Sequence, residues 1–272
     1  MSLLPTPYSL LPLQNMDAPE PEKEVKVNRW LPYWAVFQAD VQQTLNSWVY
    51  RVWLMISVLA TAGYLLFYIA LQQKAGIAQP ASVKISDLLL WSVLGGATLI
   101  IALTGGSISS ERGTMADSVL SRGISRYQYF LGKWHARVAI VLSTFCFMAL
   151  LALVGSYFFL HEDLSVGGSL VALGTIMAFL TVVTTCGVTV SAIVNSTVLG
   201  IALLWVALYG VGFTLLLLPA SYPTPVRVLK NLPHILQGLY DVTFHGRLIG
   251  YSLLGSILIS LVGLGYFGRR DV

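Results

Sequence analysis

Long apolar stretches separated by short polar segments follow one another along almost the whole chain. Six of them hold about 20 residues, enough for a helix to cross the ~30 Å hydrocarbon core of a bilayer. Residues 164–226 contain no Asp, Glu, Lys, Arg or His, and their length fits two spans joined by a turn at Asn195-Ser196-Thr197. The predicted spans are residues 50–71, 87–108, 135–159, 168–192, 197–218 and 248–267.

Composition agrees with this pattern. Of the 272 residues 56% are hydrophobic and 10% are charged, and the mean hydropathy is +0.75, whereas about a quarter of the residues in a soluble domain are charged. We therefore expect an all-α integral membrane protein, with a flexible cytosolic tail at 1–28 and one six-span transmembrane domain at 29–272. Cys146 and Cys186 fall inside spans, where a thiol behaves as a small hydrophobic group.

The positions of Lys and Arg predict the orientation, because these residues favour the cytoplasmic ends of spans. With the N-terminus inside, the inner side holds more of them than the outer side. We therefore expect a multi-pass protein of the cell (cytoplasmic, or inner) membrane with both termini in the cytoplasm, and the net charge of +4 indicates this asymmetry rather than nucleic-acid binding. The inner residues are Lys23, Lys26, Arg29, Arg51, Arg112, Arg122, Arg126, Lys133, Arg137, Arg269 and Arg270, and the outer ones are Lys74, Lys84, Arg227, Lys230 and Arg247.

Residues 33–48 carry apolar side chains at helical spacing just before the first span. This pattern predicts an amphipathic helix lying in the membrane interface. The alternative, an extension of the first span, would leave Asp40 and glutamines in lipid. The apolar side is Trp34, Phe37, Val41, Leu45 and Trp48, and the polar side is Gln38, Asp40, Gln42, Gln43 and Asn46.

Residues 219–247, between the last two spans, are too polar to cross the bilayer and too apolar for a solvated loop. We expect helical pieces near 226–232 and 234–240, packed at the outer mouth of the bundle, because irregular backbone at membrane depth must be covered by protein or face water. His234, Asp241 and His245 would share a face if this segment were one helix, and His161, Glu162 and Asp163 lie in another outer loop. Solvated side chains are the ordinary interpretation of such residues, so no metal site is predicted.

The polar stretch 109–134 lies between the second and third spans. Thr114 with Asp117 forms a capping box, and Gly123 stands where a helix would end in a left-handed residue, so a short helix is expected at 115–122. A second box, Ser125 with Gln128, starts the helix that leads into the third span. The short helix has an apolar side and a polar side, and local physics favours equally a place on the lipid surface and a place in a groove of a soluble partner. Its apolar side is Met115, Ala116, Val119 and Leu120, and its polar side is Asp117, Ser118, Ser121 and Arg122.

The same stretch resembles the loop after the second span in type-2 ABC permeases, the membrane subunits of a class of ABC transporter. The matching residues are Glu111-Arg112, Gly113-Thr114, Leu120-Ser121, Ile124-Ser125-Arg126 and Leu131-Gly132-Lys133, and the C-terminal FGRRDV is similar to the family's ending. The whole expected topology agrees as well. The chain departs from the pattern at Gly123, where Pro is common, and at Asp117, where Leu is frequent.

This resemblance implies a cytoplasmic coupling helix at 113–122 that docks on a separate ATPase. Glu111 and Arg112 would link that helix to the bundle. It further implies transport by a homodimer of the permease with two ABC-type ATPase subunits. ATP and Mg would be bound by the ATPase, and membrane lipids would surround the spans. The residues implied in partner coupling are Glu111, Arg112, Gly113, Thr114, Met115, Asp117, Val119, Leu120, Arg122 and Arg126.

Other motifs weigh against catalysis by the chain itself. Residues 263–268 match G-x-G-x-x-G, but they close an apolar helix, whereas a dinucleotide site needs a preceding strand. The last span is instead expected to pack closely through small residues, which include Gly246, Gly250, Ser252, Ser256 and Ser260. The chain has no P-loop sequence and almost no ionisable residue away from the span ends. We therefore expect a non-enzymatic permease that moves its substrate outward and binds no cofactor directly; the alternatives are a non-transporting membrane anchor or assembly factor and, third, an enzyme.

Overall fold

The computed structural model describes residues 30–75, 80–111, 123–159, 163–219 and 224–269, and all its regular elements there are helices. Six helices within these ranges are long and apolar enough to cross a membrane, so the chain is a multi-pass helical membrane protein. All six predicted spans are confirmed. The helices are α1 (Leu31–Asn46), α2 (Trp48–Ala75), α3 (Ala81–Gly105), η1 (Ser109–Glu111), α5 (Arg126–Phe159), α6 (Val166–Ile193), α7 (Thr197–Leu216), α8 (Pro225–Lys230), α9 (Leu232–Leu236) and α10 (Val242–Arg269).

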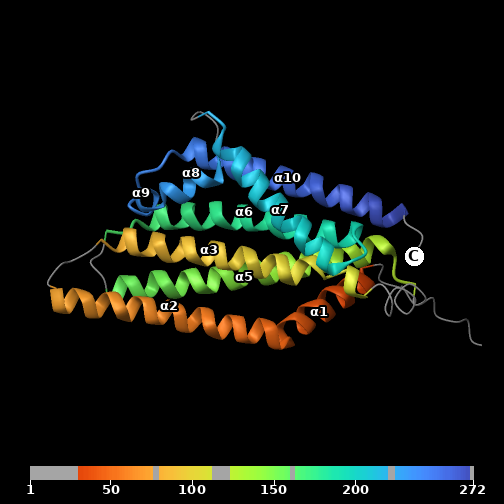
Figure 1. Cartoon of the computed structure of the whole chain (residues 1–272), viewed down its shortest axis with the longest axis horizontal. Helices are drawn as coiled ribbons and strands as arrows, with labels where there is room; N and C mark the ends of the chain where they lie inside the picture. The colour runs from red at the N-terminus through yellow and green to blue at the C-terminus, as the bar shows by residue number, and fades with distance from the viewer. Residues whose placement is uncertain (1–29, 76–79, 112–122, 160–162, 220–223, 270–272) are drawn as a thin grey trace, which may run out of the picture.

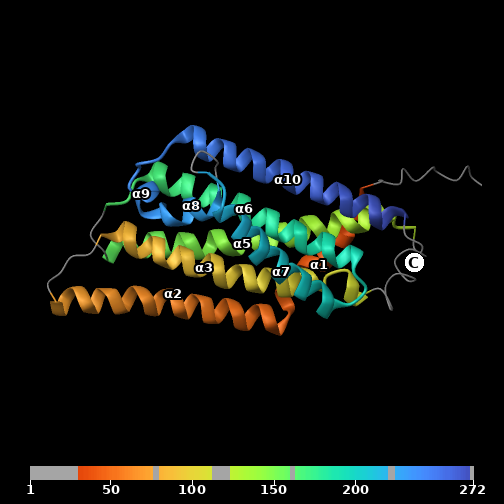
Figure 2. The ribbon, with the colours of Figure 1, turned by 45° about the horizontal axis from the view of Figure 1, so that its top comes forward.

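The spans form one elongated bundle, with α2 along one edge and α10 along the opposite edge (Figures 1 and 2). Short helices mark its two ends. Helix α1, the turn η1 and the end of α10 lie at one end, called here the α1 end, and α8 and α9 lie at the other, the α9 end. The described N- and C-terminal residues therefore lie at the same end, as an even number of spans requires.

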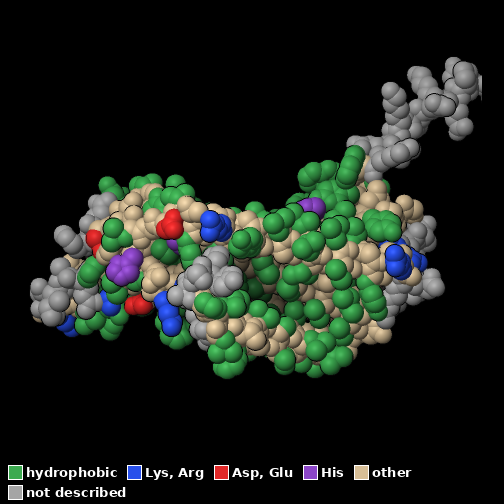
Figure 3. All heavy atoms as spheres, turned by 90° about the horizontal axis from the view of Figure 1, so that it is seen from above, with side chains coloured by type: hydrophobic (Ala, Val, Ile, Leu, Met, Phe, Trp, Pro, Cys, Tyr) green, Lys and Arg blue, Asp and Glu red, His purple; other side chains and the backbone are tan. Residues whose placement is uncertain are grey.

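The surface agrees with a membrane-spanning middle. Figure 3 shows a face on which charged side chains gather toward the two ends, while hydrophobic side chains cover most of the length between them. Helix α6 forms the centre of the bundle, with Ala172, Ile176 and Leu180 buried in the main hydrophobic core. Four of its threonines, Thr175, Thr181, Thr184 and Thr185, donate their hydroxyl protons to carbonyls one turn back, as Thr184 does to Leu180 at 2.8 Å. These bonds allow polar side chains to lie in an apolar core.

Several local predictions are confirmed. Ser125 and Gln128 form the reciprocal capping box, with N···O distances of 3.1 and 3.2 Å, and α5 starts at Arg126, directly after Ser125. Ser196 caps α7 in the predicted turn. Gly123 has a φ of +79°, the left-handed conformation expected at a helix end. The helix expected at 115–122 lies outside the described residues.

Small residues on α10 pack closely in part, as predicted. A Cβ at Gly263 would lie 2.9 Å from Phe130, and one at Gly268 would lie 2.7 Å from the Tyr127 hydroxyl. Ser256 and Ser260 are buried. Gly246 and Gly250, in contrast, have no atom within 4 Å of a Cβ position, so the close packing does not extend to them.

The outer segment is helical in two shorter pieces than expected, α8 and α9. Gly238 has a φ of +91° and interrupts the helix before α10. His234, Asp241 and His245 therefore do not lie on one helical face, because the segment is not one continuous helix. The α9 helix packs on α6 so closely that a Cβ at Gly168 would overlap the Ile235 carbonyl.

The N-terminal helix is confirmed as a separate element, because the extended backbone of Ser47 separates α1 from α2. Trp34 and Leu45 are exposed, as an interfacial helix requires. The expected place of Asp40 on a solvated polar side is wrong. Asp40 is 2% exposed and lies with Val36 and Thr44 on the buried face of α1, because partners on α5 neutralise its charge.

Candidate functional site

The candidate site is the base of the loop that joins α3 to α5 at the α1 end. Of the residues implied in coupling, the structure describes Glu111, which ends η1, and Arg126, which begins α5 and is half-buried. The remaining eight lie outside the described residues: Arg112, Gly113, Thr114, Met115, Asp117, Val119, Leu120 and Arg122. What the structure establishes is therefore how the two ends of this loop are held.

Four ionisable side chains from three helices meet there in a buried group, called here the charged quartet: Asp40, Glu111, Lys133 and Arg137. Lys133 Nζ lies 2.6 Å from Glu111 Oε2 and 3.2 Å from Asp40 Oδ1. Arg137 Nη2 donates to Asp40 Oδ1 at 3.0 Å, and its Nε forms an ion pair with Asp40 Oδ2 at 2.9 Å, although its N–H direction departs from hydrogen-bond geometry. Two negative and two positive groups thus balance.

The geometry follows from helical spacing. Lys133 and Arg137 are four residues apart, so they project from one face of α5, and Asp40 lies between them from α1. Gly132 permits the close approach of these helices, because a Cβ there would lie 2.9 Å from Val36 Cγ1 and 3.2 Å from the Tyr33 carbonyl oxygen. A glycine directly before the lysine therefore brings Lys133 within reach of α1.

Lys133 also holds the end of α3. Its ammonium group donates to the Ser107 carbonyl at 2.9 Å, so its three protons face three acceptors, Ser107, Asp40 and Glu111. A cation near the last carbonyls of a helix is favourable. The turn before Glu111 is also held by α6, since the N–H groups of Ile108 and Ser109 donate to Ser191 Oγ at 2.9 and 3.1 Å.

Aromatic side chains connect the charged quartet to the last span. The Tyr129 hydroxyl donates to Glu111 Oε2 at 2.7 Å, and its ring stacks on Phe267 of α10 at 6.1 Å between centroids. Phe130 is fully buried beside Phe267 and Val188. A movement of Glu111 would therefore be transmitted to both α5 and α10.

Burying these four charges is energetically unfavourable unless all of them stay paired. Removing one partner of a buried ion pair typically costs about 3–5 kcal/mol, because the other charge is left uncompensated. The charged quartet thus favours one arrangement of α1, η1 and α5 and penalises structures that separate them. The quartet is therefore a structural junction, since each of its four charged groups already has a partner of opposite charge.

A second polar junction lies at the α9 end. Asp163 accepts from the Ser82 N–H at 2.8 Å, from the Ser82 hydroxyl at 2.5 Å and from Gln237 Nε2 at 3.1 Å. Burial raises the pKa of Asp163, but these hydrogen bonds outweigh it and hold that pKa below its usual value. These hydrogen bonds connect the α5–α6 loop to α3 and to the end of α9. In the described part of the chain no group of three or more His, Cys, Asp or Glu is placed to bind a metal ion.

Sequence reasoning missed most of the charged quartet. From the sequence, Lys133 is noticed as a cytoplasmic charge and within the family match, Arg137 as a cytoplasmic charge alone, and Asp40 as part of the polar side of its helix. Two signals were available: one acid on an otherwise interfacial helix, and two bases four residues apart at the start of a span. Neither indicates which residues pair, because Asp40 and Arg137 are 97 positions apart.

No protein-family model matches the chain, and no curated protein matches it.

Proposed function

We propose that the chain is the permease subunit of an ATP-driven ABC transporter, of the type-2 class, acting as a homodimer with two cytosolic ATPase subunits. The charged quartet is the observation that carries the proposal. It anchors Glu111, the last described residue before the loop 112–122, to the interfacial helix and to the spans. A force applied to that loop by a partner would reach α3 and α5 through paired charges, and would reach α10 through Tyr129.

The loop's own sequence supplies the partner contact. Its expected helix presents Met115, Val119 and Leu120 on one side, and each large side chain would contribute ~1–3 kcal/mol when buried at an interface. The excess of Lys and Arg at the α1 end would place this loop in the cytoplasm of an inner-membrane protein. ATP and Mg would bind to the ATPase, and the permease itself would have no enzymatic role.

The test is co-expression with ABC-type ATPases from the same genome, followed by purification in detergent. Leu120→Asp should abolish co-purification and substrate-stimulated ATP hydrolysis, while Ser118→Asp adds the same charge on the polar side and should retain both. Arg122→Glu should have a smaller effect than Leu120→Asp. Unchanged binding and hydrolysis in the Leu120→Asp variant would contradict the coupling helix.

A liposome assay separates a transporter from a passive anchor. The complex should move substrate outward only with ATP, and the chain without the ATPase should move none. Recruitment of the ATPase without ATP-dependent transport would favour the anchor or assembly-factor alternative. Steady transport by the chain alone would contradict an ATP-driven permease.

A further inference from the structure

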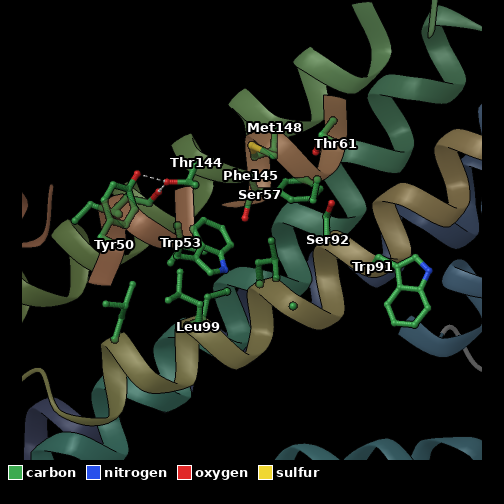
Figure 4. A pocket seen from close by; sticks show the side chains of 18 of the residues that line it. Tyr50, Trp53, Ser57, Thr61, Trp91, Ser92, Leu99, Thr144, Phe145 and Met148 are labelled. Carbon is green, nitrogen blue, oxygen red and sulfur yellow. Dashed lines mark hydrogen bonds between the residues drawn. The ribbon is translucent and has the colours of Figure 1, made fainter. Parts of the chain in front are cut away.

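A long cavity of about 320 Å³ lies between α2, α3 and α5 and is called here the slot (Figure 4). Its lining residues recur every three or four positions on each helix, so it follows the helix axes. On α2 they run from Tyr50 to Tyr64, which at 1.5 Å per residue is roughly 21 Å. This is about two thirds of the ~30 Å hydrocarbon core.

The slot carries no charge. None of its lining residues is Asp, Glu, Lys, Arg or His, and its walls are mainly leucine, isoleucine and aromatic side chains with a few hydroxyls. Figure 4 shows Trp53 and Leu99 on facing walls. At the α1 end, the Tyr50 hydroxyl and Thr144 Oγ1 are hydrogen-bonded at 2.8 Å, so the polar groups there satisfy each other. An uncharged, apolar lining of this kind suits a ligand without charge along its length.

The slot opens sideways, between α2 and α3, toward the lipid. Ala60 and Gly95 line it and are exposed, and Trp91 on the same rim is 70% exposed. A Cβ at Gly95 or Gly96 would meet nothing within 4 Å. Phe145 and Met148 of α5 form the floor and are only 6% and 5% exposed. A molecule dissolved in the bilayer can therefore enter without passing through water.

From this shape, polarity and opening we propose that the slot binds one extended hydrocarbon chain of a membrane amphiphile. The cavity is about twice the ~150 Å³ of an engineered apolar cavity that binds benzene, but it is drawn out along the bilayer normal. An acyl chain is the ligand that this membrane region supplies at high concentration. The proposal does not depend on an ATPase partner or on transport.

Photo-cross-linking of the full-length chain in nanodiscs tests the proposal. The first probe is phosphatidylcholine with a diazirine in the middle of one acyl chain, and the modified residues are located by tandem mass spectrometry. Labelling of Phe145 and Met148 is expected, because these floor residues are hidden from lipid outside the slot. Labels confined to outward residues such as Phe147 and Leu150 would overturn the proposal.

Two glycine substitutions provide a matched pair. Gly96→Phe places a ring in the slot and should lower labelling of the floor about tenfold. Gly63→Phe, on α2 and outside the slot, adds the same ring where a Cβ also meets nothing within 4 Å, and it should leave the labelling unchanged. Equal labelling in both variants would overturn the proposal.

A second probe, a single-chain alkyl alcohol carrying a diazirine, distinguishes the source of the chain. Floor labelling by phosphatidylcholine identifies bulk phospholipid, and labelling by the alcohol alone identifies a free or lipid-linked amphiphile. A helix from a second copy is the competing occupant. It would block both probes and give an intermolecular disulfide in the Gly95→Cys variant, and that result would overturn the proposal.

Discussion

Asp40 of α1 and Arg137 of α5 lie 97 positions apart in the chain and form an ion pair at 2.9 Å, with the Asp40 side chain 1% exposed. This contact fixes the N-terminal helix to the third span. With the pairing of Lys133 and Glu111 it joins three segments at the base of one loop. A helix that would otherwise lie loosely in the membrane interface thereby becomes part of the bundle.

The first prediction concerns the charge balance of the quartet. Asp40→Ala should destabilise the protein by about 3–5 kcal/mol, because Arg137 and Lys133 would keep buried charges without this partner. Gln43→Ala, on the exposed side of the same helix, should change stability by less than about 0.5 kcal/mol. Thermal unfolding in detergent measures both variants.

Replacing both partners separates charge imbalance from lost packing. The double variant Asp40→Leu with Arg137→Met should be more stable than Asp40→Ala alone, because an apolar pair leaves no orphaned charge between these two positions. A double variant as unstable as the sum of its single variants would contradict the ion pair as the cause.

The second prediction concerns the contact between α1 and α5. Gly132→Leu should destabilise the protein by about 1–3 kcal/mol, because its Cβ would lie 2.9 Å from Val36 Cγ1 and would push Asp40 away from Lys133. Gly250→Leu is the control, since a Cβ there meets nothing within 4 Å. Limited proteolysis between α1 and α2 should become faster only in the Gly132 variant. Equal rates would contradict the inferred close packing.

The third prediction is a pH dependence at the α9 end. Because the pKa of Asp163 in the folded protein lies below its usual value, the carboxylate stabilises the fold above the unfolded pKa of about 3.9. This contribution is lost as pH falls through the folded pKa. Asp163→Asn should therefore unfold at a lower temperature than the unmutated protein at pH 6.

The same difference should shrink as the pH is lowered below about 4, where the carboxyl group becomes protonated. Ser82→Ala removes the hydroxyl donor to Asp163 and should weaken the effect. Asp241→Asn, which removes an exposed carboxylate just after α9, is the control. A stability difference independent of pH would contradict the role of the ionised group.

The sequence by itself determined the features that depend on local interactions. The six spans follow from the length of the apolar runs, because a bilayer requires about 20 such residues per helix. The Ser125 and Gln128 box and the turn at Ser196 follow from side chains that bond to backbone groups three residues away. The two helical pieces of the outer segment agree with the prediction to within a few residues. The left-handed conformation of Gly238, which places His234 and His245 on different helices, does not follow from the sequence.

Only the tertiary structure decided which distant groups meet. Polar periodicity placed Asp40 in solvent, because amphipathic patterns assume that charges face water, whereas paired charges can be buried together. The floor of the slot could not be predicted either, because Phe145 and Met148 look like any core residues of a span. Whether such residues face a packed neighbour or a cavity depends on how closely α2 and α3 approach each other, and that distance is set by contacts between residues far apart in the chain.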